Sequence, residues 1–138
     1  ATYNLAGARA DAEFLFGKHA EKALPRIRMV AKNVCHGVVY DIKLHEFLAE
    51  NIKGSASLSW IWKAMDAYLK RKPSGKKLHD PLAAIVALEP SICSYSQAVP
   101  YNVKGRWGSK LAEEQDRFDI AITVDHELFL KAFAYHKL

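Results

Sequence analysis

The sequence has little cysteine and no long apolar run. Its two cysteines, Cys35 and Cys93, fit neither a disulfide framework nor a local metal-binding spacing, so we expect both thiols to be unpaired. The longest apolar stretch, at 82–88, falls far short of the ~20 residues that cross a bilayer, which predicts a soluble protein. No leader pattern opens the chain, and because it begins with Ala1 we expect that a preceding segment has been removed. The compartment, cytoplasmic or secreted after processing, stays open.

The length and charge of the chain limit the number of domains and the kinds of partner that are expected. A chain of 138 residues, half of them hydrophobic, is predicted to form one domain over residues 1–138. The net charge of +5 favours a nucleic-acid partner only where the cations cluster. The one dense basic run, at 70–77, is interrupted by Pro73, Ser74 and Gly75. Such a run is typical of a solvated helix end and loop, so nucleic acid is not the expected partner.

Helical and extended patterns alternate along the chain, which predicts an α/β fold. Helices are predicted at 8–23, at 43–52, from Ser55 or Ser57 to Pro73, at 82–88 with Asp80 as N-cap and Pro81 as first residue, and after a capping Asp125. The nearly all-apolar body of 82–88 indicates a buried helix. Strands are predicted at 27–30 and 119–124, and in a β-rich segment at 34–39 with Cys35, His36 and Gly37 at or just past a strand end. Residues 91–115 are typical of a hairpin, with Pro100 at an edge and Gly105 and Gly108 in turns.

His79 is the most suggestive of the six histidines, because it stands with Asp80 and Pro81 at the start of an apolar helix. Side chains at a helix N-terminus project into the crevice where open α/β folds bind ligands, and an imidazole there can act as a general acid. The alternative is that Asp80 only caps the helix. The motif by itself leaves both interpretations open.

A resemblance to a known family favours the first interpretation. Residues 78–83 look like the His-Asp-Pro-Leu-Ala signature of the inosine- and uridine-preferring nucleoside hydrolases. Tyr3-Asn4 and 11–13 resemble that family's aromatic-Asn segment and helix start, and 34–36 resembles its Val-Thr-His turn. Segments 105–108, 120–124 and 125–129 are similar to its glycine-bearing hairpin, last strand and closing helix. The resemblance spans essentially the whole chain, but only the C-terminal half of the family's domain.

The resemblance implies roles for four residues. His79 corresponds to the histidine that protonates the departing base. Asp80 corresponds to a carboxylate that ligates the catalytic calcium and approaches the ribose hydroxyls, and Asn4 to an asparagine that hydrogen-bonds the sugar. Tyr68 lies roughly where family members place an aromatic residue near the base; the alternative is an ordinary core or rim tyrosine.

Two features of the family have no counterpart in the sequence. Thr2 stands where the family has a glutamate that contacts the ribose. The N-terminal aspartate cluster, which holds calcium and orients the attacking water, has no match either, and Asp116, Asp119 and Asp125 are predicted to be surface carboxylates. Asp80 alone supplies at most two of the about six to eight oxygens that calcium takes. We therefore expect weak calcium binding and negligible hydrolysis by this chain alone.

The expected fold is a partly parallel sheet flanked by helices, with strands 27–30 and 119–124 in one sheet. A half-domain exposes a sheet edge, so we expect a homo-oligomer or a complementary N-terminal fragment. Three functions stay open: cleavage of the N-glycosidic bond of ribonucleosides by the full assembly, non-catalytic lectin-like binding of a sugar or nucleoside, and basic RNA binding or attack. The third depends on Trp60, Trp62, Tyr68 and the basic run at 70–77, for which a core role of the aromatic residues is the stronger alternative.

Overall fold

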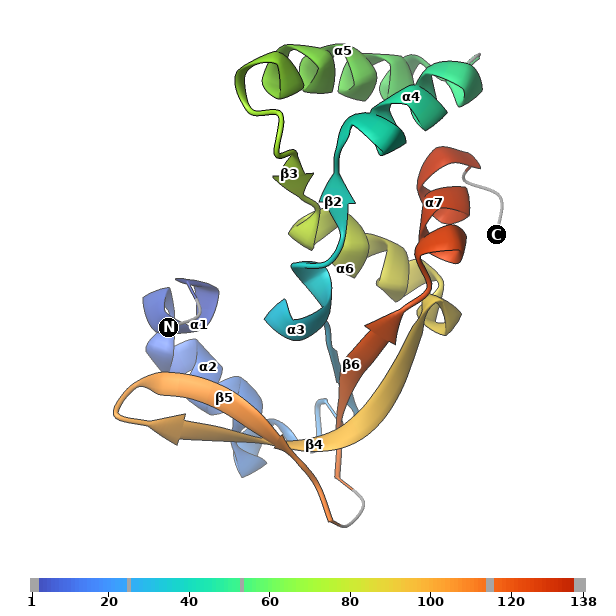
Figure 1. The fold of residues 1–138 in the computed structure, drawn as a ribbon. Coiled ribbons are helices and arrows are strands. Elements are labelled where there is room, and N and C mark those ends of the chain that lie inside the picture. The colour runs from blue at the N-terminus through green and yellow to red at the C-terminus, as the bar shows by residue number, and fades with distance from the viewer. Residues whose placement is uncertain (1–2, 25, 53, 114–115, 136–138) are drawn as a thin grey trace. The chain divides into compact units, whose positions relative to one another are not determined.

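The computed structural model describes residues 3–24, 26–52, 54–113 and 116–135, and it divides the chain into two compact units (Figure 1). Unit 1 comprises Ala1–Met29 and Tyr95–Ile122, and unit 2 comprises Val30–Ser94 and Thr123–Leu138. Within the described ranges, no helix has the length and apolar character needed to cross a membrane. That the two units form a single domain stays a prediction.

A mixed four-stranded sheet, in the order β1-β6-β4-β5, is the framework of unit 1. Strand β1 (Ile27–Met29) runs parallel to β6 (Phe118–Val124), with Ile27 opposite Phe118. Strands β4 (Cys93–Val103) and β5 (Arg106–Leu111) form an antiparallel hairpin. The first residues of β4 and the last of β6 belong to unit 2. The predicted α/β class, the partly parallel sheet and the hairpin are therefore confirmed.

The hairpin turns at Lys104 and Gly105, whose φ angles of 51° and 78° are both left-handed. Two left-handed residues form the turn that best matches the twist of paired strands, which is why glycine suits position 105. The prediction that Gly108 also lies in a turn is wrong. Gly108 lies within β5 opposite Tyr101, and a Cβ atom there would lie 2.5 Å from Cζ of that tyrosine. Glycine at 108 makes room for a neighbouring ring rather than for a turn.

Strand β4 as a whole lies between β6 and β5, so the edge expected at Pro100 exists only locally, on the side of β4 that faces away from β5. Pro100 pairs with Ser109 on β5. Side-chain contacts between β4 and β6 join Ser94 to Thr123 and Gln97 to Asp119. Pro100 therefore lies beyond the part of β4 that faces β6, where a missing N–H costs no hydrogen bond on that side.

A short helix and a single helical turn replace the one helix predicted at 8–23, and another short helix precedes them. Helix α1 (Tyr3–Gly7) packs on β5, and α2 (Arg9–Phe16) ends at Gly17, whose extended backbone breaks the helix before the single turn η1 (Lys18–Ala20). The ring of Phe16 lies 4.9 Å from the ring of Trp107 and 5.7 Å from that of Phe118. These aromatic contacts hold α2 against β5 and β6.

Asp119 is a correction to the sequence analysis, because it is buried rather than on the surface. Arg26 donates to it from Nε at 2.6 Å, and the Gln97 amide donates to the same carboxylate. This pairing compensates the buried charge and joins the segment before β1 to β6. Asp116 is half-buried and accepts a hydrogen bond from the backbone N–H of Arg117. Asp125 is exposed, as predicted.

Unit 2 is mainly helical. Its elements are α3 (Lys32–Cys35), β2 (Val39–Tyr40), α4 (Ile42–Asn51), α5 (Ala56–Arg71), β3 (Lys76–Lys77), α6 (His79–Leu88), η2 (Pro90–Ile92) and α7 (His126–Tyr135). Asp41, Ser55 and Asp125 accept hydrogen bonds from backbone N–H groups at the starts of α4, α5 and α7. The predicted Ser55 and Asp125 caps are therefore confirmed.

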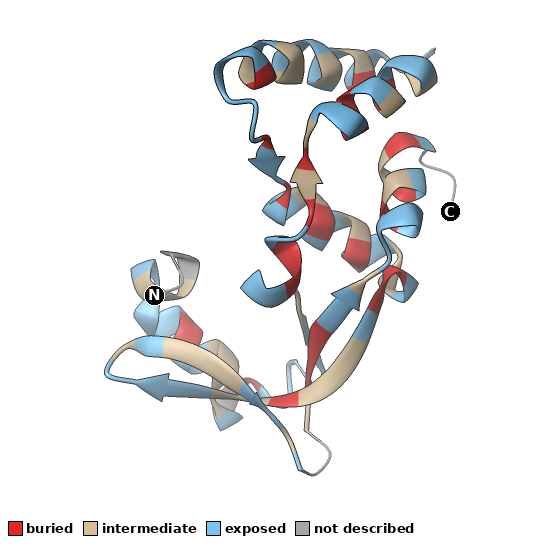
Figure 2. Cartoon of the chain, viewed as in Figure 1, coloured by how far each residue is buried: buried red, intermediate tan, exposed pale blue. Residues whose placement is uncertain are grey.

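The core of unit 2 lies where α4 packs against α5 and α7, and α6 against α7. Its buried residues include Leu44, Leu48, Leu82, Val86 and Phe129, and Figure 2 colours the ribbon red at buried positions. Helix α6 buries Leu82 and Val86 but leaves its small apolar residues and its last leucine exposed. The prediction that 82–88 is buried all round is therefore wrong, because only one face of α6 packs against the elements of unit 2.

Candidate functional site

His79 and Asp80 occupy the first turn of α6 in unit 2, and both are exposed. The predicted capping role of Asp80 is wrong. The helix begins two residues earlier than predicted, with Leu78 as its N-cap residue and no side-chain cap, so Pro81 is its third residue. Leu78 is buried, and its N–H donates to the carbonyl of Val38 at 2.9 Å. The Asp80 carboxylate therefore lies near the positive end of the helix, in solvent, without a capping bond.

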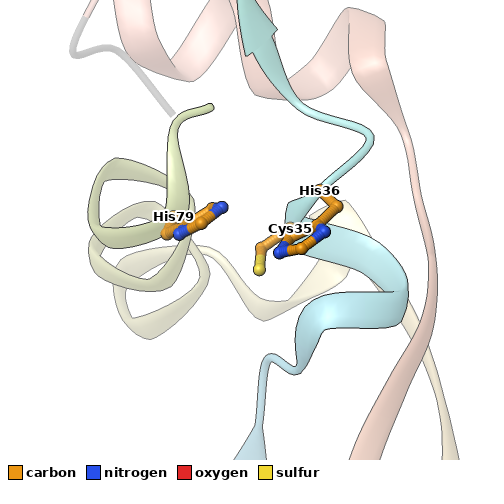
Figure 3. Close-up of side chains that lie close together, drawn as sticks. All are labelled: Cys35, His36 and His79. Carbon is orange, nitrogen blue, oxygen red and sulfur yellow. The ribbon is translucent and has the colours of Figure 1, made fainter. Parts of the chain in front are cut away.

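Cys35, the last residue of α3, and His36, which follows it, lie close to His79, as Figure 3 shows. The rings of His36 and His79 are stacked, with centroids 5.0 Å apart and planes 10° from parallel. The Cys35 sulfur and one nitrogen of each imidazole all lie within 4.8 Å of one another. We call Cys35, His36 and His79 the Cys-His-His cluster.

The local structure of this cluster differs from the sequence prediction. Cys35 and His36 were expected at or just past a strand end, but Cys35 ends the short helix α3 and His36 follows it. The neighbouring valines favoured a strand by their propensity. Buried Val34 instead packs from a helical turn, and extended structure starts only at Val39. The helical turn presents the Cys35 thiol and the His36 ring together towards α6 (Figure 3).

Lysines surround the cluster. The Lys77 ammonium lies 3.2 Å from Nδ1 of His36. Loss of hydration, followed by electrostatic interactions with Lys77, His79 and Lys32, lowers the pKa of His36 below its ordinary value. Burial raises the pKa of the Cys35 thiol, and the nearby lysines only partly oppose this rise. Near neutral pH, His36 and Cys35 are therefore held in their uncharged forms, and His36 can accept a hydrogen bond from Lys77.

Tyr68 lies on α5 in the same unit and is half-buried. The Lys76 ammonium lies 5.5 Å from the centre of its ring. Because β3 consists of Lys76 and Lys77, one short strand places a cation at Tyr68 and the next at His36. Tyr68 is thus a rim residue beside a basic strand, and its role near a base stays a prediction.

Asn4 belongs to unit 1, on helix α1, and its side chain lies outside the described residues, as does Thr2. The predicted meeting of Asn4 with His79 and Asp80 in one cleft therefore stays a prediction. The site residues that the structure brings together are His79 and Asp80 with Cys35, His36 and Lys77.

Calcium does not fit the donors of this site. The atoms gathered beside Asp80 are a sulfur and two nitrogens, with the Lys77 ammonium among them. Calcium takes about six to eight oxygen ligands. The described residues of this chain therefore do not make a calcium site by themselves, and a calcium role of Asp80 requires oxygens from elsewhere.

Sequence reasoning missed the Cys-His-His cluster. Cys35 was judged to fit no metal spacing, and the described residues show it beside two imidazoles. The adjacent Cys35-His36 pair was the available signal, but His79 lies far along the chain, and only the pairing of β2 with β3 brings the segments together. Cys35 and Cys93 are both buried, and neither forms a disulfide in the described part of the chain, as predicted.

The aromatic residues invoked for RNA stacking differ in exposure. Trp62 stacks on the buried His45 ring at 4.5 Å, and its indole N–H donates to the His45 carbonyl. Trp62 thus has the packing role that was the stronger alternative. Trp60 is 74% exposed, and Lys63 lies 5.8 Å from its ring centre.

Comparisons with known proteins give a likeness of fold. The sequence matches no known family profile and no curated protein sequence. A plant nucleoside hydrolase matches with a TM-score of 0.71 and 21% sequence identity, over 97% of this chain and 46% of that one. A purine-preferring ribonucleoside hydrolase from Gardnerella vaginalis matches with a TM-score of 0.59 and 20% identity, over 79% of this chain and 38% of that one. This chain therefore spans less than half the length of these enzymes, and over that part it resembles ribonucleoside hydrolases in fold, as its motifs predicted.

Proposed function

We propose that this chain provides the base-protonating part of a ribonucleoside hydrolase site. The observation that carries the proposal is the exposed His79-Asp80 pair in the first turn of α6, on a fold like that of ribonucleoside hydrolases. Histidine is the side chain best suited to exchange a proton near neutral pH, so His79 would protonate the departing base. The neighbouring Asp80 carboxylate would accept hydrogen bonds from the ribose hydroxyls.

Cleavage of an N-glycosidic bond also needs an activated water on the other side of the sugar. The sequence contains no aspartate cluster of the kind that orients this water. The proposal therefore includes a complementary polypeptide segment, or a second copy of the chain, that brings the missing groups and the calcium oxygens. Among the described residues, β1 pairs only with β6 and forms one edge of the sheet. An added strand at 27–29 would cover this edge, which makes it the candidate contact surface.

The test compares the isolated chain with the native assembly purified from its source. The assembly should release free base from inosine or uridine in the presence of calcium, and the isolated chain should release none. In the assembly, His79→Gln should lower the rate by roughly 10²- to 10⁴-fold, the usual contribution of a general acid. His126→Gln, at the exposed start of α7, is the matched control. Turnover by the isolated chain, or full turnover by the His79→Gln assembly, would contradict the proposal.

The alternative is a protein that binds a sugar or nucleoside without cleaving it. The absence of the aspartate cluster from the sequence favours this alternative. Titration calorimetry with ribose and inosine separates the two. Binding that is lost in Asp80→Asn, by a native assembly that releases no base, would establish the binding function in place of hydrolysis.

A further inference from the structure

We propose that the Cys-His-His cluster is a binding site for a thiophilic divalent cation, with Zn²⁺ as the best fit. Cys35, His36 and His79 already gather one sulfur and two nitrogens within 4.8 Å of one another. Such a set suits Zn²⁺ and its chemical relatives, and it does not suit calcium or magnesium, which take oxygen ligands. This inference goes beyond the proposed hydrolase function and is tested separately from it, because a chain with the cation bound at His79 would not have that imidazole free to protonate a base.

The geometry requires only a small adjustment. Zinc lies about 2.3 Å from thiolate sulfur and about 2.0–2.1 Å from imidazole nitrogen, so tetrahedral ligands lie roughly 3.3–3.6 Å apart. Measured against the 4.8 Å limit in this structure, the donor atoms need to approach by at most roughly 1.5 Å. His36 and His79 are both exposed, so rotation of their rings can supply this movement while buried Cys35 stays in place. A fourth position is left for water, as in open zinc sites.

The backbone holds the two ligand-bearing segments close together. Val39 and Tyr40 on β2 pair with Lys77 and Lys76 on β3, and the N–H of Leu78 donates to the carbonyl of Val38. The bonded residues lie just after His36 on one segment and just before His79 on the other. The separation of the two imidazoles is thus set by main-chain hydrogen bonds, so a bound cation would order little more than side chains.

Lys77 opposes the cation. Its ammonium lies 3.2 Å from Nδ1 of His36, so it must swing into solvent when a dication binds. Lys77 is exposed, which allows this movement. Replacing it with methionine removes the repulsion and the competing contact. We expect Lys77→Met to tighten cation binding by roughly 3- to 10-fold at physiological salt.

The experiment titrates the reduced full chain with Co²⁺, which reports its own ligands. The expected spectrum has a thiolate-to-cobalt charge-transfer band in the near ultraviolet and intense visible bands of tetrahedral Co²⁺, and added Zn²⁺ should abolish both. Cys35→Ser should remove the charge-transfer band. His36→Gln and His79→Gln should each weaken binding by at least about 10- to 100-fold, the loss typical of even an outer-shell partner.

Matched controls lie outside the cluster. Cys93→Ser changes the other buried cysteine, and His126→Gln changes an exposed histidine on α7. Both should bind Co²⁺ like the unaltered chain. Because Cys35 is buried, circular dichroism must show that Cys35→Ser is folded. If Cys35→Ser does not fold, His79→Gln still tests the proposal, because His79 is exposed.

The proposal is overturned if the unaltered, folded chain shows no charge-transfer band when it is titrated with Co²⁺. It is also overturned if the band persists in Cys35→Ser, or if His79→Gln binds Co²⁺ as tightly as His126→Gln. These measurements need no nucleoside and no second polypeptide. Failure of the hydrolase proposal would leave the cobalt spectrum unchanged, so the two proposals fail separately.

Discussion

Gly75 is the residue whose replacement should most clearly disturb unit 2. It precedes β3 and is buried, with a left-handed φ of 81°. A Cβ atom at this position would lie 2.5 Å from the carbonyl oxygen of Tyr40 and 2.8 Å from Cγ1 of Val39. Gly75→Ala therefore combines an unfavourable backbone conformation with a clash against the strand that pairs with β3.

The magnitude follows from these two parts. A left-handed conformation costs a residue with a side chain about 1–2 kcal/mol relative to glycine. The close contacts involve backbone and a neighbouring strand, so something must shift, which typically costs about 1–3 kcal/mol more. We expect Gly75→Ala to lower the free energy of unfolding by about 2–5 kcal/mol.

Gly54→Ala is the matched control. Gly54 has a φ of 88°, but a Cβ atom there would meet nothing within 4 Å. Its replacement should therefore cost only the conformational part, about 1–2 kcal/mol. Urea unfolding followed by circular dichroism measures both variants, and hydrogen exchange locates the loss of protection at β2 and β3 in Gly75→Ala.

A second readout links Gly75 to the Cys-His-His cluster. Displacement of β3 would move Lys77 and loosen the link between His36 and His79, so Co²⁺ binding should weaken in Gly75→Ala and not in Gly54→Ala. Equal stability losses in the two variants would refute the reasoning, because the contact with Tyr40 would then contribute nothing.

Three further predictions concern other parts of the chain. Arg26→Met should lower the melting temperature, because it leaves the buried Asp119 carboxylate without its cation. Adding Asp119→Asn should recover part of this loss. The control is Arg106→Met, which replaces an exposed arginine on β5 and should change the melting temperature little. Burial raises the pKa of Tyr40 to about 12, so the unfolded chain loses the Tyr40 proton at a lower pH than the folded chain. The contribution of Tyr40 to the free energy of unfolding is therefore complete below pH about 10 and declines as the pH rises towards 12. Urea titrations of Tyr40→Phe should lack this part of the loss of stability. Light scattering at micromolar concentration should give the mass of a dimer or of a complex with a second polypeptide; a monomer mass would contradict the partner proposal and favour the binding function.

The sequence by itself determined the elements whose signals are local. The caps at Ser55 and Asp125 follow from a side chain bonding its own helix start, and the hairpin follows from a left-handed glycine between extended segments. The presence of strands 27–30 and 119–124 in one partly parallel sheet was also predicted, since strands alternate with helical segments along the chain, but that the two strands pair directly was shown only by the structure. The His79-Asp80 motif was visible in the sequence without any coordinates, and its role in facing a ligand stays a prediction.

Tertiary structure decided the features that depend on residues far apart in sequence. The burial of Asp119 requires Arg26, at a separation of 93 residues, which no local pattern reveals. The start of α6 moved from Asp80 to Leu78 because Leu78 is buried and its N–H bonds to Val38. The Cys-His-His cluster exists because the pairing of β2 with β3 brings α3 to the start of α6. Local signals place those caps and turns in which a residue bonds its own neighbours, whereas the charge, burial and donor set around a side chain depend on which distant segment packs against it.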